Sequence, residues 1–329
     1  MFLRNSWYVA AWDREVSTNL LARVLLGEPV VLYRKQNGEA VALEDRCCHR
    51  HLPLSMGKLE GDRLRCGYHG LLFDAAGTCV EIPGQESIPA QARVRAYPVM
   101  ERYRWVWVWM GDPDKADPAL VPNWWWTEHK DWAFTRPDRV YLKCNYQLIA
   151  DNVLDVTHLA YVHSSSIGSP SIVDFPATVE REDRLVRLTR WIRERPPPPL
   201  YQRAGGFAGN VERWQIVEHR PPCFTVNFAG CQDVAKKIDL MALSAPTPET
   251  ESTTHYFFGF VRNFGLGDAE MEKIFAIDMV NVFNEDFPVL EAQQRMLELR
   301  PGAPKVDIKV DAAPLAARRI LESLLAKER

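Results

Sequence analysis

Two short motifs, each with one cysteine and one histidine, constrain this chain more than any other feature of its sequence. The first is Cys47-Cys48-His49, and the second, which follows after 16 residues, is Cys66-Gly67-Tyr68-His69. Each motif comes at the end of a predicted strand, so its side chains are expected in an exposed loop. Two thiolates suit one iron of a [2Fe–2S] cluster, and two imidazoles suit the other iron and raise the reduction potential. We therefore predict that the cluster ligands are Cys47, His49, Cys66 and His69.

Two other interpretations of these residues are a zinc site and a coincidental set of core residues. Zinc fingers usually pair cysteine with cysteine and histidine with histidine along the chain, whereas each loop here supplies one of each. Two loops that each carry one cysteine and one histidine at similar spacing are also unusual for residues that do not share a metal or cluster. The cluster is therefore favoured. The other cysteines, expected as core or surface residues, are Cys48, Cys79, Cys144, Cys223 and Cys231.

A second group of metal-binding residue types lies in the middle of the chain. A helix is predicted over residues 148–161, on which Asp151, Asp155 and His158 would share one face because they are four and three residues apart. His163 lies five residues after His158, so we expect the helix to end or bulge there and to turn His163 toward the same metal. Acidic and imidazole groups on a largely apolar helix need partners or a metal.

Two histidines and one carboxylate form the facial triad of non-heme Fe(II) oxygenases. A long helix is predicted over residues 269–299, with a kink or break at Pro288. Asp286 falls on the apolar face of this helix, whereas Glu285 falls on the polar face. We predict that a mononuclear iron is bound by His158, His163 and Asp286. The alternative is a helix whose polar core residues satisfy one another. Asp155 is expected to hydrogen-bond to a metal-binding histidine.

The order of the predicted elements separates the chain into two parts. Residues 1–112 read as short strands and hairpins, and the segment after Gly111 is rich in Pro, Asp and Ala. Residues 113–329 contain strands and helices without βαβ alternation, which predicts an α+β fold. The strands expected in the first part are 23–26, 30–34, 41–44, 64–73, 78–82 and 103–110. Those of the second part are 185–192, 211–217, 224–228 and 253–261, with an extended loop at 196–199 and a last helix at 315–327.

The composition excludes several classes of protein. Hydrophobic residues make up 47% of the 329 residues, and the net charge is only −3, so a nucleic-acid-binding basic face is not expected. No apolar run approaches the roughly 20 residues that span a bilayer, and the first residues are too polar for a secretory signal. We therefore expect a soluble, cytoplasmic protein. Its seven cysteines, an odd number in a chain that looks intracellular, are not expected to form disulfides.

With both residue groups in view, the chain resembles the oxygenase components of Rieske non-heme iron monooxygenases, in the group of vanillate O-demethylase, toluenesulfonate methyl-monooxygenase and dicamba O-demethylase. Beyond the two motifs, the likeness includes Arg4–Ala11, Ile82–Gln85, Arg262–Phe264 and Asn284–Asp286. It implies an N-terminal all-β Rieske domain and a C-terminal helix-grip catalytic domain with an antiparallel sheet. It also implies a homotrimer, in which Asp155 would bridge a cluster histidine of one subunit to His158 of the next.

The resemblance further implies hydroxylation of a methyl or methoxy carbon of an aromatic acid with O2. Two electrons must come from outside, and the chain has no glycine-rich dinucleotide motif after a strand. NAD(P)H is therefore expected to act through a separate flavin- and iron–sulfur-containing reductase. Asn227 is expected to contact the substrate, as the matching position can in relatives. The alternatives are a ring-cis-dihydroxylating dioxygenase with the same two centres and a Rieske electron-transfer protein without a second metal.

Overall fold

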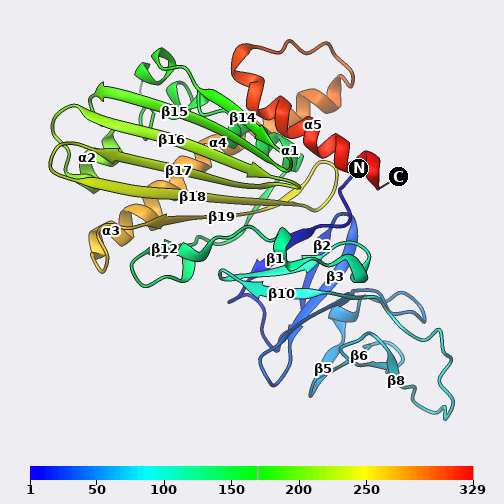
Figure 1. Cartoon of the computed structure of the whole chain (residues 1–329). Coiled ribbons are helices and arrows are strands. Elements are labelled where there is room, and N and C mark those ends of the chain that lie inside the picture. The colour runs from blue at the N-terminus through cyan, green and yellow to red at the C-terminus, as the bar shows by residue number, and fades with distance from the viewer. Residues whose placement is uncertain (169, 329) are drawn as a thin grey trace. The chain divides into compact units, whose positions relative to one another are not determined.

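The computed structural model describes residues 1–168 and 170–328, which fall into two compact units (Figure 1). One unit consists of Phe2–Val121 and Thr247–Thr250. The other contains Met1, Pro122–Pro246 and the residues from Glu251 onward. The expected domain boundary after residue 112 stays a prediction. The proline-rich segment that follows it, up to Val121, groups with the unit that begins at Phe2.

The unit that begins at Phe2 is built from three small antiparallel sheets. The first sheet is formed by β1 (Trp7–Trp12), β11 (Trp105–Trp109) and β10 (Val99–Arg102). The second is formed by β2 (Leu21–Leu25), β3 (Glu28–Arg34), β4 (Ala40–Glu44) and β9 (Ala96–Tyr97). The third is formed by β5 (Lys58–Glu60), β6 (Arg63–Arg65), β7 (Leu72–Phe73) and β8 (Cys79–Glu81).

Most strands predicted for this unit are present. The β2–β3 hairpin is confirmed, and β11 is buried on both faces, as its alternating tryptophans and valines predicted. The expectation of one continuous strand over residues 64–73 is wrong. A loop over residues 66–71 separates β6 from β7 and carries the second Cys/His motif. Leu64 and the apolar run over residues 71–73 extended the predicted strand across this loop, whose backbone closes on itself through the bonds from Cys66 N–H to Leu71 O and from Gly70 N–H to Cys66 O.

The other unit is organised around one eight-stranded antiparallel sheet (Figure 1). Its strands, in spatial order, are β12 (Ala133–Thr135), β19 (Thr254–Arg262), β18 (Lys237–Pro248), β17 (Phe224–Gln232), β16 (Val211–Arg220), β15 (Leu185–Arg195) and β14 (Thr178–Glu182), while β13 (Val140–Leu142) pairs with β19. β18 is absent from the sequence prediction. Its Pro246 and Pro248 argue against a central strand, because proline cannot donate to the ladder.

Helices pack against this sheet and build its main core. They are α1 (Tyr146–Leu154), α2 (Pro199–Gly205), α3 (Ala269–Lys273), α4 (Met279–Leu299) and α5 (Ala312–Lys327). Leu148 and Ile149 of α1 meet Met279 and Leu290 of α4 and the sheet residue Leu240 in one buried cluster. Packing of the apolar faces of α1 and α4 on the sheet therefore fixes the space between them.

Three helix predictions require correction. The helix expected over residues 148–161 ends at Leu154, because the Asp155 carboxylate accepts the Thr157 N–H at 2.8 Å and so turns the chain. The long helix is interrupted by a π-helical turn over Ile274–Asp278 rather than at Pro288, which lies inside α4. α2 begins at Pro199, so the loop expected over residues 196–199 is shorter than predicted. Proline suits the first turn of a helix, where its missing N–H has no partner to lose.

Among residues 1–168 and 170–328, none of the helices is both long and apolar enough to cross a bilayer.

Candidate metal centres and cavity

The two Cys/His motifs form loops with the same backbone hydrogen bonds. The N–H of Cys47 donates to Leu52 O, and the N–H of Cys66 donates to Leu71 O, each at 2.9 Å. In each loop the residue four positions after the cysteine has a left-handed backbone, with φ of 56° at His51 and 74° at Gly70. The two loops are thus equivalent in their backbone hydrogen bonds, although their Cys–His spacings differ by one residue, and this arrangement suits a shared group with like ligands.

The four side chains separate by residue type. The thiols of Cys47 and Cys66 are buried, and burial is the main cause that raises the pKa of Cys47 to about 11, with the nearby Cys66 thiol adding to it. The His49 and His69 rings are exposed, and their centroids lie 4.5 Å apart. A pair of buried thiols beneath a pair of exposed imidazoles fits a [2Fe–2S] cluster with one thiolate-bound and one histidine-bound iron.

The second residue group is assembled from the end of α1, the loop after it and α4. Because α1 stops at Leu154, Asp151, Asp155 and His158 do not share one helical face as predicted. His158 instead begins a 3-10 turn, and the carbonyl of His163 is held by the N–H groups of Ser166 and Gly168, at 3.0 and 2.9 Å. The structure brings His158, His163 and Asp286 together, with one potential ligand atom of each within 4.8 Å of the others.

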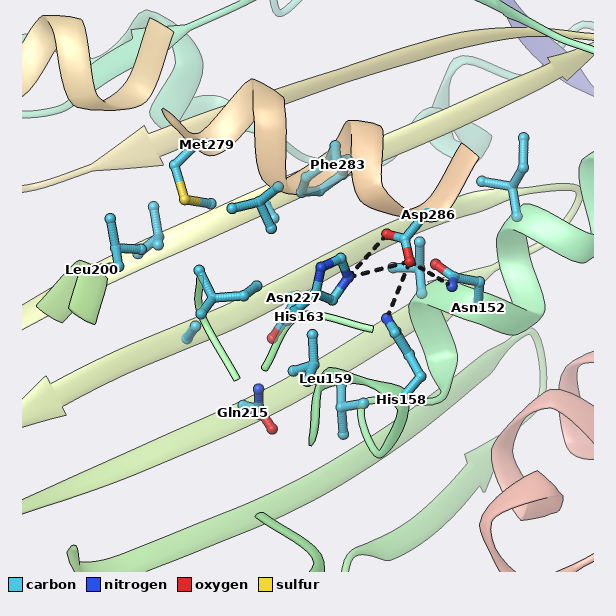
Figure 2. A pocket seen from close by; sticks show the side chains of 18 of the residues that line it. Asn152, His158, Leu159, His163, Leu200, Gln215, Asn227, Met279, Phe283 and Asp286 are labelled. Carbon is cyan, nitrogen blue, oxygen red and sulfur yellow. Dashed lines mark hydrogen bonds and ion pairs between the residues drawn. The ribbon is translucent and has the colours of Figure 1, made fainter. Parts of the chain in front are cut away.

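Figure 2 shows both imidazoles directed at Asp286, and hydrogen bonds at their Nδ1 atoms hold them in this orientation. The Nδ1 atom of His158 meets the backbone carbonyl of Asp155, and Nδ1 of His163 lies 2.7 Å from Oε2 of Glu285. Carbonyl and carboxylate oxygens only accept, so both Nδ1 atoms carry the hydrogen in the neutral rings. Both Nε2 lone pairs therefore point at the Asp286 carboxylate, 3.6 Å away from His158 and 3.2 Å away from His163.

This donor set fits a divalent metal ion. Ligand atoms held about 2.1 Å from a metal at neighbouring positions lie roughly 3 Å apart, which is the scale of the two Nε2–carboxylate distances. Burial lowers the pKa of His158. Burial also lowers the pKa of His163, but Asp286 and Glu285 outweigh that effect and raise this pKa overall. Two imidazole lone pairs and an anionic carboxylate this close repel one another unless a proton or a metal ion lies between them. A metal with two histidine and one carboxylate ligands supplies such a positive charge.

Two residues around this group were missed or misassigned from the sequence. The amide Nδ2 of Asn152 donates to Oδ1 of Asp286 at 3.1 Å. Glu285, expected on the polar face of its helix, accepts from His163, and Ser166 Oγ also donates to it at 3.1 Å. The long side chain of Glu285 reaches sideways to His163. Helical periodicity predicts which face a residue lies on, but it does not predict such a reach. An outer carboxylate of this kind orients a metal-binding histidine.

The two predicted aspartates near α1 have other surroundings. Asp151 points away from the group and forms a two-oxygen ion pair with Arg318 of α5. Asp155 caps α1, its carboxylate accepts from Thr157, and its backbone carbonyl rather than its carboxylate contacts His158. The role expected for the Asp155 carboxylate toward a cluster histidine stays a prediction.

A cavity of about 100 Å³ adjoins the three candidate ligands. Its walls come from α1, the loop after it, α4 and the inner face of the sheet, and they are mainly apolar, as at Leu159, Leu240 and Phe283. Asn227 lies in this wall, and its Oδ1 has no hydrogen-bond partner among the described residues. The volume is on the scale of the roughly 150 Å³ cavity that accepts a benzene molecule in another protein, so a substrate of one aromatic ring suits the site.

Comparison with known proteins agrees with this arrangement. The Rieske [2Fe-2S] domain family matches residues 6–98, and the family of the vanillate O-demethylase oxygenase C-terminal domain matches residues 142–327. The iron-sulfur subunit of the toluene-4-sulfonate monooxygenase system of Comamonas testosteroni is 41% identical to this chain, covering 100% of this chain and 98% of that subunit.

Two solved structures of dicamba monooxygenase have the same fold. The complex with 3,6-dichlorosalicylic acid aligns with a TM-score of 0.94 and 33% identity, over 99% of this chain and 98% of that one. The structure with non-heme iron and dicamba aligns with a TM-score of 0.87 and 32% identity, over 99% and 98% of the two chains. The predicted α+β architecture, an N-terminal Rieske domain followed by a catalytic domain with an antiparallel sheet, is thereby confirmed.

Proposed function

The chain belongs to the Rieske non-heme iron monooxygenases as an oxygenase component, and on that premise we propose that it hydroxylates a methyl or methoxy carbon of an aromatic acid. The observation that carries the proposal is the convergence of His158, His163 and Asp286 beside a cavity suited to one aromatic ring. The family contributes the class of reaction, and the cavity contributes the size of the substrate.

The chain's own residues have distinct roles in this proposal. His158, His163 and Asp286 hold the iron, while the [2Fe–2S] cluster is held by Cys47, His49, Cys66 and His69. Bound iron supplies the activation of O2 and the attack on the C–H bond. Glu285 and the Asp155 carbonyl keep the two imidazoles in the tautomer that presents Nε2 to the metal. The apolar wall excludes bulk water from the reacting carbon.

The reaction balances when two electrons and two protons are supplied with O2 and the substrate. One oxygen atom enters the C–H bond as hydroxyl, and the other leaves as water. A hydroxylated methyl group is a stable alcohol, whereas a hydroxylated methoxy group loses formaldehyde and leaves a phenol. A [2Fe–2S] cluster passes one electron at a time, so a flavin- and iron–sulfur-containing reductase that oxidises NAD(P)H is the proposed partner. A cytoplasmic location provides that reductant.

We further propose that electrons reach the iron across a subunit boundary in a homotrimer. In that arrangement the Asp155 carboxylate connects a cluster histidine of one subunit with His158 of the next. This role agrees with the half-buried position of Asp155, whose carbonyl already contacts His158. Asn227 is proposed to contact the substrate, because its side chain reaches the cavity.

The test is turnover of defined single-ring acids by the holoenzyme with a surrogate reductase. Three irons and two acid-labile sulfides per chain are expected, together with formaldehyde from methoxybenzoates or hydroxymethyl products from methylbenzenesulfonates. The His158→Ala variant should keep the visible spectrum of the cluster and lose turnover. A cis-diol product would favour the dioxygenase alternative, and full activity of His158→Ala would contradict the proposed iron site.

A further inference from the structure

Arg213 is a buried cation in the wall of an otherwise mainly apolar cavity. It lies on β16, is only 4% exposed, and lines the same cavity as the three proposed iron ligands. Among the described residues that line this cavity, it is the only arginine or lysine. Arg190, on the neighbouring strand β15, is also buried, but it donates to Thr157 Oγ1 at 2.9 Å and does not line the cavity. The permanent positive charge in the wall of this cavity is therefore that of Arg213.

The groups around Arg213 leave it cationic. Burial lowers the pKa of its guanidinium, and Tyr201 and Cys231 act in the opposite direction. Burial is also the main cause that raises the pKa values of Tyr201 and Cys231 to about 12. Both groups are therefore neutral near pH 7, whereas an arginine remains protonated in proteins. An anion that entered the cavity would meet the positive charge of this guanidinium, screened by little water.

Arg213 lies toward the end of the cavity away from the proposed iron. In strand register it pairs with Cys231, four residues along β17 from Asn227, a separation of roughly 13 Å. Its neighbour Tyr201 belongs to α2, next to Leu200. Figure 2 shows Leu200 and Met279 on the side of the cavity away from Asp286. Met279 precedes Asp286 by seven residues of α4, or roughly 10 Å along the helix.

Two amide side chains extend this polar wall toward the iron side. Gln215 follows Arg213 by two residues on β16, so both side chains lie on the same face of the sheet. The Oε1 atom of Gln215 and the Oδ1 atom of Asn227 have no hydrogen-bond partner among the described residues. Buried polar groups without partners are costly, and a polar ligand group that enters the cavity can satisfy them.

From these observations we propose that Arg213 anchors the anionic group of the substrate, at the end of the cavity opposite the carbon that is hydroxylated. The inference rests on the proposed function, because it takes an aromatic acid as the substrate. It adds a geometric requirement. Because Arg213 and the proposed iron lie at opposite ends of the cavity, the anchor suits a benzene ring whose acidic and reacting groups are in para positions. A carboxylate or a sulfonate offers two oxygens to the planar guanidinium.

The experiment measures equilibrium binding to the anaerobic, iron-loaded holoenzyme. The ligands are matched pairs that differ in charge: 4-methylbenzenesulfonate with 4-methylbenzenesulfonamide, and 4-methoxybenzoate with 4-methoxybenzamide. The variants are Arg213→Met, which keeps an unbranched apolar side chain without the charge, and Arg213→Lys, which keeps the charge. Arg187→Met is the control, because Arg187 pairs with Glu218 on the outer face of the same sheet.

The wild-type protein is expected to prefer the anion of each pair. Arg213→Met should weaken binding of the anions by about 30- to 1,000-fold, as removal of one partner of a buried charged hydrogen bond does, and change binding of the amides by less than about threefold. Arg213→Lys should retain part of the preference for the anion. The 2-methyl isomer of the sulfonate should bind the wild-type protein less tightly than the 4-methyl isomer.

Several outcomes would overturn the anchor. These are an equal loss for anion and amide in Arg213→Met, an unchanged preference for the anion, and a wild-type protein that prefers the amides or binds neither ligand of a pair. If Arg213→Met does not fold, the wild-type pairs and Arg213→Lys still decide the question. If the wild-type protein hydroxylates these acids but does not bind the anions more tightly than the amides, the result contradicts the anchor alone. A preference that depends on Arg213, in a protein that hydroxylates none of these acids, contradicts the proposed function alone.

Discussion

Replacing Glu285 by glutamine tests whether the second carboxylate of α4 controls iron binding through His163. The His163 Nδ1 atom lies 2.7 Å from Glu285 Oε2, a short distance for a hydrogen bond to a charged acceptor. Such a bond contributes about 1.5–3 kcal/mol. Residues that orient metal ligands typically change metal affinity by about 10- to 100-fold, which is about 1.4–2.8 kcal/mol. The two estimates agree, so the expected loss of Fe(II) affinity lies in this range.

The lower end of the range is expected for Glu285→Gln, because an amide oxygen can still accept the hydrogen bond. Glu285→Leu, which removes the acceptor, should approach the upper end. The assay is an anaerobic Fe(II) titration of protein that retains its [2Fe–2S] cluster, with the visible spectrum of the cluster as a check on folding. Glu298→Gln is the control, since Glu298 is an exposed residue of the same helix. Wild-type affinity in Glu285→Leu, or an equal loss in Glu298→Gln, would refute the reasoning.

Three other substitutions test, one by one, the loop that carries His163, the packing of α1 on α5, and the delivery of electrons to the iron. Gly168→Ala should lower both the iron content and the free energy of unfolding, the latter by about 2 kcal/mol or more, because a Cβ there would lie 1.8 Å from Leu159 O. Normal iron content and an unchanged melting temperature would contradict this prediction. Asp151→Asn should weaken the partly buried ion pair with Arg318 and reduce the free energy of unfolding, measured in urea, by about 1–3 kcal/mol, while iron binding stays intact. Loss of iron without destabilisation would instead indicate that Asp151 takes part in the metal site. Asp155→Asn should leave both metals bound and slow the reduction of the iron in single turnover, which unchanged kinetics would contradict.

The parts of the candidate sites that could be predicted are those encoded over short distances. The spacing of cysteine and histidine in each loop is a local property, and the two loops indeed repeat one hydrogen-bond pattern. Asp286 could be proposed as a ligand because burying a carboxylate on an apolar helical stripe is costly unless a partner or a metal compensates its charge. Phe275, Met279, Val282 and Leu290 around it are all buried.

The parts that failed depend on competition between local and distant contacts. Periodicity extends a helix through residue 161, but the Asp155 carboxylate offers the Thr157 N–H a nearer partner and ends it. Asp151 instead forms an ion pair with Arg318, which is 167 residues away in the sequence. No local sequence pattern could predict this pair. Asn152, one position further along the helix, takes the place beside Asp286 that the sequence assigned to its acidic neighbours.

This division between local and distant information also explains why the class of reaction is easier to predict than the substrate. The proposed iron ligands and their partners contact one another through the end of α1, one loop and α4, so a change in one of them disturbs the whole group. Arg213 and Gln215, by contrast, are side chains on the face of a strand whose backbone is paired on both sides. Substitution there leaves the ladder of backbone hydrogen bonds intact. Relatives with the same metal centres can therefore differ in the charge and shape of the cavity wall, and the identity of the substrate must be read from those positions rather than from the ligand motifs.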